Sequence, residues 1–208
     1  MIERMAEQLL LPGIDPPPPP ARRSRGKARP RERLPHSLFF AIFPNPQDAA
    51  SLSALAVRLH AQHGLKGTPT EAHRLHVTLL EVGDNTSAPR DRVARALQAA
   101  ATVAPPMFGV SFDQAMTFSN GAFVLCEGQR VSQIAGFRQR LGEALADAGF
   151  KPPRSFTPHM TLAYKTRRKI AVHPIEPLQW TAGSFALIDS HVGEGVHEVL
   201  GQWPPMPL

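Results

Sequence analysis

Two short runs of similar sequence limit the folds that this chain can adopt. The first contains His76 and Thr78, the second contains His159 and Thr161, and each has the pattern His-x-Thr-Leu among alternating apolar residues. In a β-strand, side chains two residues apart point to the same face. The pattern therefore predicts two half-buried strands in different parts of the chain, each of which presents an imidazole and a hydroxyl on one face.

The rest of the chain contains signals for both strands and helices. Asn45 followed by Pro46 is typical of a helix start, and Asn120-Gly121 between apolar runs indicates a β-hairpin. Pro158 predicts an edge position or a bulge in the second His-x-Thr strand. The expected strands are 36–43, 74–82, 108–118, 122–127, 155–164, 180–190 and 195–203, and the expected helices are 46–63, 89–103 and 131–148.

This order of elements predicts an α+β fold with antiparallel sheets, because hairpins interrupt the strand–helix alternation that a parallel sheet needs. Each His-x-Thr strand follows a helix, which indicates a weak internal duplication. The strand at 36–43 is apolar on both faces, so we expect it to be central and buried.

The first 33 residues differ in composition from the remainder. A run of five prolines at 16–20 is followed by seven basic residues and one acidic residue at 22–33, which together account for the whole formal net charge of +6. We expect residues 1–33 to form a disordered leader, either a solvated tail or an RNA-binding arm. The folded domain should comprise residues 34–208, and any contact of that domain with nucleic acid would depend on local charge.

Composition also restricts the compartment and the cofactors. The single cysteine, Cys126, excludes an intramolecular disulfide framework and a cysteine-based zinc site. No apolar run reaches the length of a transmembrane helix, and the N-terminus lacks the features of a signal peptide. We therefore expect a cytoplasmic protein without a membrane partner.

The paired motifs, His-Val-Thr-Leu at 76–79 and His-Met-Thr-Leu at 159–162, resemble the signature of the two-histidine (2H) phosphoesterases. More narrowly, they resemble the RNA 2′,3′-cyclic phosphodiesterases, also called 2′-5′ RNA ligases. The opening strand at 38–42, the Phe-Thr-Pro-His sequence at 156–159 and the closing segment at 187–204 agree with this family. The resemblance covers about residues 35–205.

The family resemblance implies a bilobed fold in which two antiparallel sheets, with helices packed outside, flank a central cleft. One His-x-Thr strand would line each side of that cleft. The resemblance implies no metal ion and no other cofactor. The expected partner is RNA with 2′,3′-cyclic phosphate ends, and we expect the chain to be a monomer.

Hydrolysis of a cyclic phosphate needs a base, an acid and fixed donors to the phosphate oxygens, and two imidazoles and two hydroxyls can supply these groups. By resemblance, His76 would be the proton donor, His159 the proton acceptor, and Thr78 and Thr161 the phosphate-binding residues. The sequence alone does not fix which histidine has which role. Hydrolysis would leave a 2′-phosphate, and the reverse reaction with a 5′-hydroxyl end would make a 2′-5′ linkage.

The family often has an arginine two residues after the second Thr-Leu, where this chain has Tyr164 followed by Lys165. Lys165 or Arg154 is a candidate replacement for that arginine. Phe40, Phe123 and Tyr164 are candidates for stacking on a base, although aromatic residues in strands are usually core residues and we expect each to be buried. The basic loop at 165–169 is either a solvated loop or a surface that attracts RNA phosphates.

Three alternatives stay open. A metal site at His60 and His63 is disfavoured, because no Asp, Glu or His at a standard spacing completes a zinc site. A 2H phosphoesterase could instead act on a small cyclic nucleotide or on a 2′-5′ oligonucleotide. From a different class, the chain could be an RNA-binding module that lacks catalysis.

Overall fold

The computed structural model describes residues 35–128, 132–151, 153 and 155–205. The predicted leader at 1–33 and Arg154 lie outside these ranges. In chain order the elements are β1 (His36–Ile42), α1 (Pro46–Gln62), the 3-10 helix η1 (Ala72–Arg74), β2 (Val77–Asn85), α2 (Arg90–Ala101), β3 (Phe108–Thr117), β4 (Phe123–Cys126), α3 (Gln133–Asp147), β5 (His159–Ala163), β6 (His173–Ala182), β7 (Phe185–His191) and β8 (Val196–Trp203).

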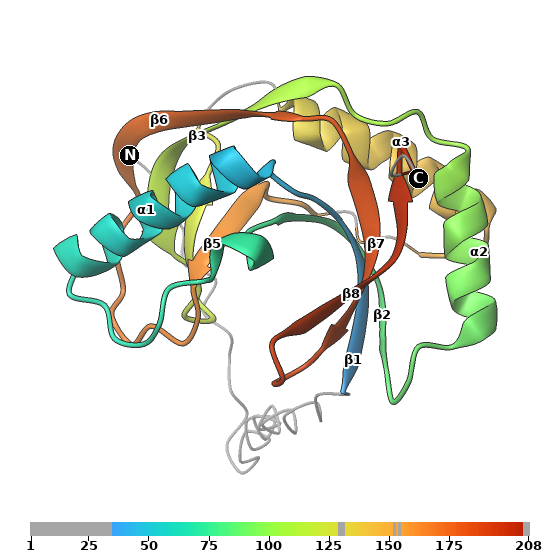
Figure 1. Cartoon of the computed structure of the whole chain (residues 1–208), viewed down its shortest axis with the longest axis horizontal. Helices are drawn as coiled ribbons and strands as arrows, with labels where there is room; N and C mark the ends of the chain where they lie inside the picture. The colour runs from blue at the N-terminus through green and yellow to red at the C-terminus, as the bar shows by residue number, and fades with distance from the viewer. Residues whose placement is uncertain (1–34, 129–131, 152, 154, 206–208) are drawn as a thin grey trace, which may run out of the picture. The chain divides into compact units, whose positions relative to one another are not determined.

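The strands form two antiparallel sheets of four strands each. The first sheet has the order β2-β1-β7-β8, and the second has the order β5-β4-β3-β6. β2 and β5, which carry the two His-x-Thr motifs, are therefore edge strands of different sheets, and they contact each other (Figure 1). The predicted α+β fold is confirmed, as is the central, buried position of β1.

Two of the helices cross from one sheet to the other. α1 connects β1 to β2 in the first sheet but packs against β5 of the second, and α3 connects β4 to β5 but packs against β2 of the first as well as β3. The strand–helix–strand order thus occurs twice, each time with a helix that contacts the other sheet. α2 packs on α3 and β8. Among the described residues, no helix combines the length and apolar character needed to cross a bilayer.

The core lies mainly between the sheets and the three helices. Phe40, Phe112, Phe137 and Phe185 are completely buried there. The opposite face of each sheet has a small apolar cluster of its own. We call these the cleft clusters; the first contains Phe39, Ala41, Phe43, Ala186 and Ile188, and the second contains Met116, Phe118, Ala122, Val124 and Cys126.

Local sequence signals fix several element ends. The Asn45 side chain accepts a hydrogen bond from the backbone N of Asp48 at 2.9 Å, and Pro46 begins α1, as predicted. Side-chain caps of this kind contribute about 1 kcal/mol. Gly64, just beyond α1, has a φ of +55°, a left-handed conformation that glycine adopts at little cost.

The structure corrects the predicted strand at 180–190. Residues 180–182 end β6, residues 185–191 form β7, and the two strands belong to different sheets. The start of β6 was missed because Pro174 and Pro177 are unusual within a strand. They are tolerated here because β6 is an edge strand and needs fewer backbone donors. Pro158 likewise directly precedes β5, the opposite edge of the same sheet.

Candidate active site

The two motif histidines are held in the same way. His76 directly precedes β2, and its Nδ1 donates to the backbone carbonyl of Arg74 at 2.7 Å. His159 begins β5, and its Nδ1 donates to the carbonyl of Thr157 at 2.8 Å. Because a carbonyl can only accept, each Nδ1 must carry the proton. Nε2 of each ring is therefore the nitrogen available for proton transfer.

Strand register places the motif threonines on the cleft-cluster faces. Thr78 pairs with Ala41, and Thr161 pairs with Val124, which belong to the first and second cleft clusters respectively. His159 pairs with Cys126 of the second cluster. Directly opposite residues in a sheet point to the same face. As predicted, each motif presents its polar side chains away from the main core.

A cavity of about 280 Å³ brings the two motifs together. Thr78 of the first motif and His159 of the second both line it, together with Phe118, Arg138 and Phe156. His76 does not line this cavity, but it is close enough for the charge of His159 to lower its pKa. The structure thus assembles an imidazole and a hydroxyl from opposite sheets in one cavity, with the second imidazole nearby.

His76 is enclosed by rings. Its ring stacks on the ring of Phe39, with centroids 5.2 Å apart and an interplanar angle of 20°. The centroids of the Phe43 and His197 rings lie 5.7 and 5.3 Å from the centroid of the His76 ring. Burial is the main cause that lowers the pKa of His76 from 6.5 to about 4; the hydrogen bond to the Arg74 carbonyl opposes this, and neighbouring cationic groups add to it. At neutral pH, His76 is therefore uncharged and its Nε2 is an acceptor.

His159 has a more open setting. Its ring lies edge-on to Phe118 at 4.9 Å, and both side chains face the cavity. Each motif histidine therefore contacts a phenylalanine of its own cleft cluster, Phe39 for the first and Phe118 for the second. These contacts limit ring rotation and leave Nε2 as the accessible atom.

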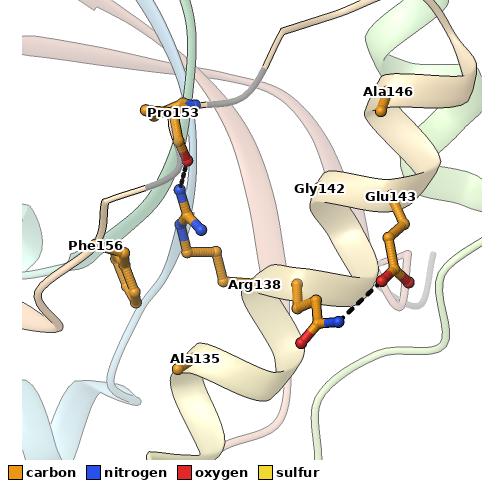
Figure 2. Close-up of a pocket in the computed structure, with 8 residues that line it drawn as sticks. Ala135, Arg138, Gly142, Glu143, Ala146, Pro153 and Phe156 are labelled. Atoms are coloured by element: carbon orange, nitrogen blue, oxygen red, sulfur yellow. Dashed lines mark hydrogen bonds between the residues drawn. The ribbon is translucent and has the colours of Figure 1, made fainter.

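Arg138 of α3 connects the two sides of the site. Its Nε donates to the carbonyl of Leu79 in β2 at 3.1 Å, and its Nη2 donates to the carbonyl of Pro153, ahead of His159. The guanidinium lies over the ring of Phe156, 4.7 Å from the centroid. Figure 2 shows Arg138 between Pro153 and Phe156. Arg138 thus supplies positive charge to the cavity wall and ties the first motif strand to the segment that positions the second.

A larger cavity of about 550 Å³ runs along α3 and shares Arg138, Pro153 and Phe156 with the first. Gln139 and Glu143 also line this cavity and hydrogen-bond to each other at 3.0 Å, and Figure 2 shows Glu143 on α3. Because the two cavities share three wall residues, they lie next to each other along α3.

His197 of β8 adds a polar group beside His76. Burial is the main cause that lowers the pKa of His197, followed by the charges of Arg74 and His73. Within the described part of the chain, His197 Nδ1 and Arg74 Nε are buried without a hydrogen-bond partner. Buried polar groups are normally satisfied, so these two atoms could bind water or ligand atoms next to His76.

The other predicted contact residues have mixed outcomes. Phe40 and Phe123 are completely buried, so the core interpretation is confirmed and stacking on a base is wrong for both. Tyr164 is 51% exposed, so its predicted burial is wrong. Tyr164 and Lys165 follow the end of β5 and do not line the cavity that contains Thr78 and His159. Arg154 lies outside the described residues.

The structure also shows the contacts of the basic loop at 165–169 and of the histidines at the end of α1. Arg168 donates to the carbonyl of His63 at 2.8 Å, so this loop residue stabilises the end of α1. His63 Nε2 faces His173 Nε2 at 3.2 Å, and His60 Nε2 has no hydrogen-bond partner among the described residues. Neither His60 nor His63 belongs to a described group of three or more residues that could hold a metal ion.

Phe39, Phe118, Arg138 and His197 are among the site residues that the sequence analysis did not identify. Phe39 has a usable signal, because it alternates with Phe40 in β1 and therefore faces the opposite side of the sheet. The position of Arg138 depends on how α3 crosses to the other sheet, for which the sequence has no local signal.

The two four-stranded antiparallel sheets, whose facing edge strands each carry a His-x-Thr motif, match the LigT-like 2H phosphoesterase fold. A family profile described as the 2′-5′ RNA ligase superfamily matches residues 43–194. The chain therefore belongs to the 2′-5′ RNA ligase superfamily. A search of curated proteins finds no match.

Solved structures share this fold at low sequence identity. Escherichia coli LigT complexed with NADP+ is 22% identical with a TM-score of 0.64, and the match covers 81% of this chain and 97% of LigT. LigT complexed with 3′-AMP is also 22% identical, with a TM-score of 0.64 over 83% of this chain and 99% of LigT. The protein TT0787 of Thermus thermophilus is 21% identical, with a TM-score of 0.61 over 80% and 96% of the two chains.

Proposed function

We propose that this protein hydrolyses 2′,3′-cyclic phosphate ends of RNA to 2′-phosphates, with His76 as proton donor and His159 as proton acceptor. The observation that carries the proposal is the matched fixation of two imidazoles. Each Nδ1 donates to the carbonyl two residues earlier, at 2.7 and 2.8 Å, and each Nε2 is left for chemistry at facing edges of two sheets. Membership of the 2′-5′ RNA ligase superfamily supports RNA as the substrate class.

The reaction needs two coordinated proton transfers. His159 takes a proton from water as the water oxygen forms a bond to phosphorus, and His76 gives its proton to the 3′ oxygen as the bond from phosphorus to that oxygen breaks. The products are a free 3′-hydroxyl and a 2′-phosphate, and a second proton exchange with solvent restores both histidines. Thr78 and Thr161 would donate to the nonbridging oxygens, where negative charge accumulates.

The donor role requires a charged His76, whereas burial lowers its pKa to about 4. A phosphodiester anion beside the ring favours the charged form and offsets the desolvation that lowers this pKa. We infer that substrate binding raises the pKa of His76, so that the proton is taken up together with the substrate. Arg138, which lines the cavity together with Thr78 and His159, neutralises part of the phosphate charge and helps to attract the anion.

Ligation would use the same groups in the same roles, with a different nucleophile. A 5′-hydroxyl in place of water would be deprotonated by His159, and its oxygen would attack phosphorus while His76 protonates the 3′ oxygen. The product would be a 2′-5′ phosphodiester with a 3′-hydroxyl. E. coli LigT, which shares the fold, has been crystallised with 3′-AMP and with phosphate. Ligands of this chemistry would suit the depression at Thr78 and His159.

The second cavity along α3, of about 550 Å³, favours an oligonucleotide over a mononucleotide. It adjoins the cavity of Thr78 and His159 through Arg138 and Phe156 and has space for at least part of a neighbouring nucleotide. The test compares kcat/KM for a short RNA that ends in a 2′,3′-cyclic phosphate with kcat/KM for 2′,3′-cyclic AMP. We expect kcat/KM for the RNA to be about tenfold higher or more, because each additional base stacked on an aromatic side chain contributes about 1–3 kcal/mol.

Product analysis completes this test. Phosphorus NMR of the reaction should show a 2′-phosphate, since His76 is assigned to the 3′ oxygen. A 3′-phosphate product would contradict the assigned roles of the two histidines. A higher kcat/KM for the mononucleotide would contradict the RNA assignment and favour a 2H phosphoesterase that acts on small cyclic nucleotides.

A further inference from the structure

A second cluster of histidine and carboxylate side chains lies on the first sheet. His36 of β1 is directly opposite His191 of β7, and Asp189 of β7 is directly opposite Glu198 of β8. Asp189 and His191 are two residues apart in the same strand. Because paired residues and residues two apart share a face, all four side chains project from the same face across three neighbouring strands. We call these four residues the outer-face cluster.

This cluster is on the opposite side of the sheet from the candidate active site. Asp189 lies two residues after Leu187 in β7 and therefore shares its face, which is the face of the main core, since Leu187 is paired with Phe40. His76, in contrast, stacks on Phe39, which belongs to the first cleft cluster. The first sheet therefore lies between the outer-face cluster and His76. The outer-face cluster does not contribute a side chain to the proposed hydrolysis.

The donor atoms of the outer-face cluster converge. His36 Nδ1 lies 2.9 Å from Asp189 Oδ2, and His191 Nε2 lies 4.0 Å from the same oxygen and 3.8 Å from Glu198 Oε2. Around zinc, tetrahedral ligands at about 2.0–2.1 Å from the metal are about 3.3 Å from one another. One ligand atom from each of His36, Asp189 and His191 lies within 4.8 Å of the other two. Shifts of less than about 1 Å would therefore form a metal site.

The charges in the cluster also favour a cation. The Asp189 side chain is 4% exposed, and in the described part of the chain its ion-pair partners are histidines. Glu194 and Glu198 likewise pair only with His191 there. A buried carboxylate needs a compensating positive charge, and histidines supply one only when they are protonated. A bound divalent ion would supply that charge across the whole neutral pH range.

We propose that His36, Asp189 and His191 bind one divalent transition-metal ion of the zinc class, with the Glu198 carboxylate as a fourth ligand. Two imidazoles with one carboxylate form a ligand set that zinc and its neighbours commonly accept. The donors lie on paired strands, which hold them more rigidly than loops do. To bind the ion through Nδ1, His36 must carry its ring proton on Nε2 instead, and protons compete with the ion for both imidazoles, so binding weakens in acid.

The experiment uses the full-length protein without an affinity tag. Bound metal is first removed with EDTA, and the protein is then dialysed against chelator-buffered zinc and assayed for zinc by elemental analysis. In a parallel sample Co²⁺ replaces zinc, and its visible spectrum reports the coordination geometry. We expect about one zinc per chain, and affinity at least about tenfold weaker in His191→Ala and in Asp189→Asn. The matched control is the double variant His63→Ala/His173→Ala, which removes a different histidine pair and should keep full zinc affinity.

His191→Ala keeps the test decisive if Asp189→Asn does not fold, because the His191 side chain is partly exposed and its removal leaves the core intact. No stoichiometric zinc in the wild-type protein would overturn the proposal. So would zinc affinity that survives in His191→Ala or that disappears in the His63/His173 control. The readout is metal content, so the result does not depend on which phosphate ester the active site hydrolyses.

Discussion

Acidification should destabilise the folded protein through His76. Its pKa falls from 6.5 to about 4 in the folded state, mainly because of burial. Between these two pH values the unfolded chain binds more protons at this histidine than the folded chain does, so stability rises with pH and is lost as pH falls. The loss relative to neutral pH is about 2 kcal/mol at pH 5 and about 3 kcal/mol at pH 4. Domains of this size are usually stable by only about 5–15 kcal/mol.

The assay is urea unfolding of wild type and His76→Asn over the range pH 7.5 to 4.5, followed by tryptophan fluorescence. The variant should lose about 2 kcal/mol less than wild type between pH 7 and pH 5, because asparagine does not titrate. His73→Asn is the matched control, since that side chain is 73% exposed; it should lose as much as wild type. Equal losses in wild type and His76→Asn would refute the reasoning.

Three further predictions concern the site. Binding of 2′-AMP, a mimic of the product end, should raise the pKa of His76 by about one unit or more. An NMR titration of the His76 ring that 2′-AMP leaves unchanged would show that the phosphate does not bind beside this ring. Thr78→Val should lower kcat by about 10- to 100-fold, since a hydrogen bond to a charged group contributes about 1.5–3 kcal/mol, whereas Thr78→Ser should restore most of the rate. Arg138→Lys should lower kcat/KM by about tenfold, because lysine keeps the charge but cannot donate to both the Leu79 and the Pro153 carbonyl. Arg140→Lys on the same helix is the control, and equal effects in the two variants would argue against a bridging role for Arg138.

The sequence predicts the motif geometry well because that geometry is local. Alternation along a strand is enough to place His76 with Thr78, and His159 with Thr161, on single faces. The helix start at Asn45 and Pro46 is equally local. Each of these predictions depends on backbone geometry over a few residues, which tertiary packing rarely overrides.

The errors arise where tertiary structure decides. β6 contains two prolines and is stable only because it is an edge strand, which the sequence does not reveal. Tyr164 resembles a strand residue, but β5 ends at Ala163 and leaves it exposed. Arg138 enters the site because α3 crosses to the other sheet. No short-range pattern reports that crossing.

The roles of the two histidines are tested most directly by one measurement on RNA. A short RNA with a 2′,3′-cyclic phosphate end is incubated in EDTA with wild type, His76→Ala or His159→Ala, and both turnover and RNA affinity are recorded. We predict turnover by wild type, a loss of at least about 100-fold in each variant, and little change in affinity. Wild type that binds the RNA without turnover, or variants that retain full turnover, would contradict two-histidine catalysis and favour a non-catalytic RNA-binding module.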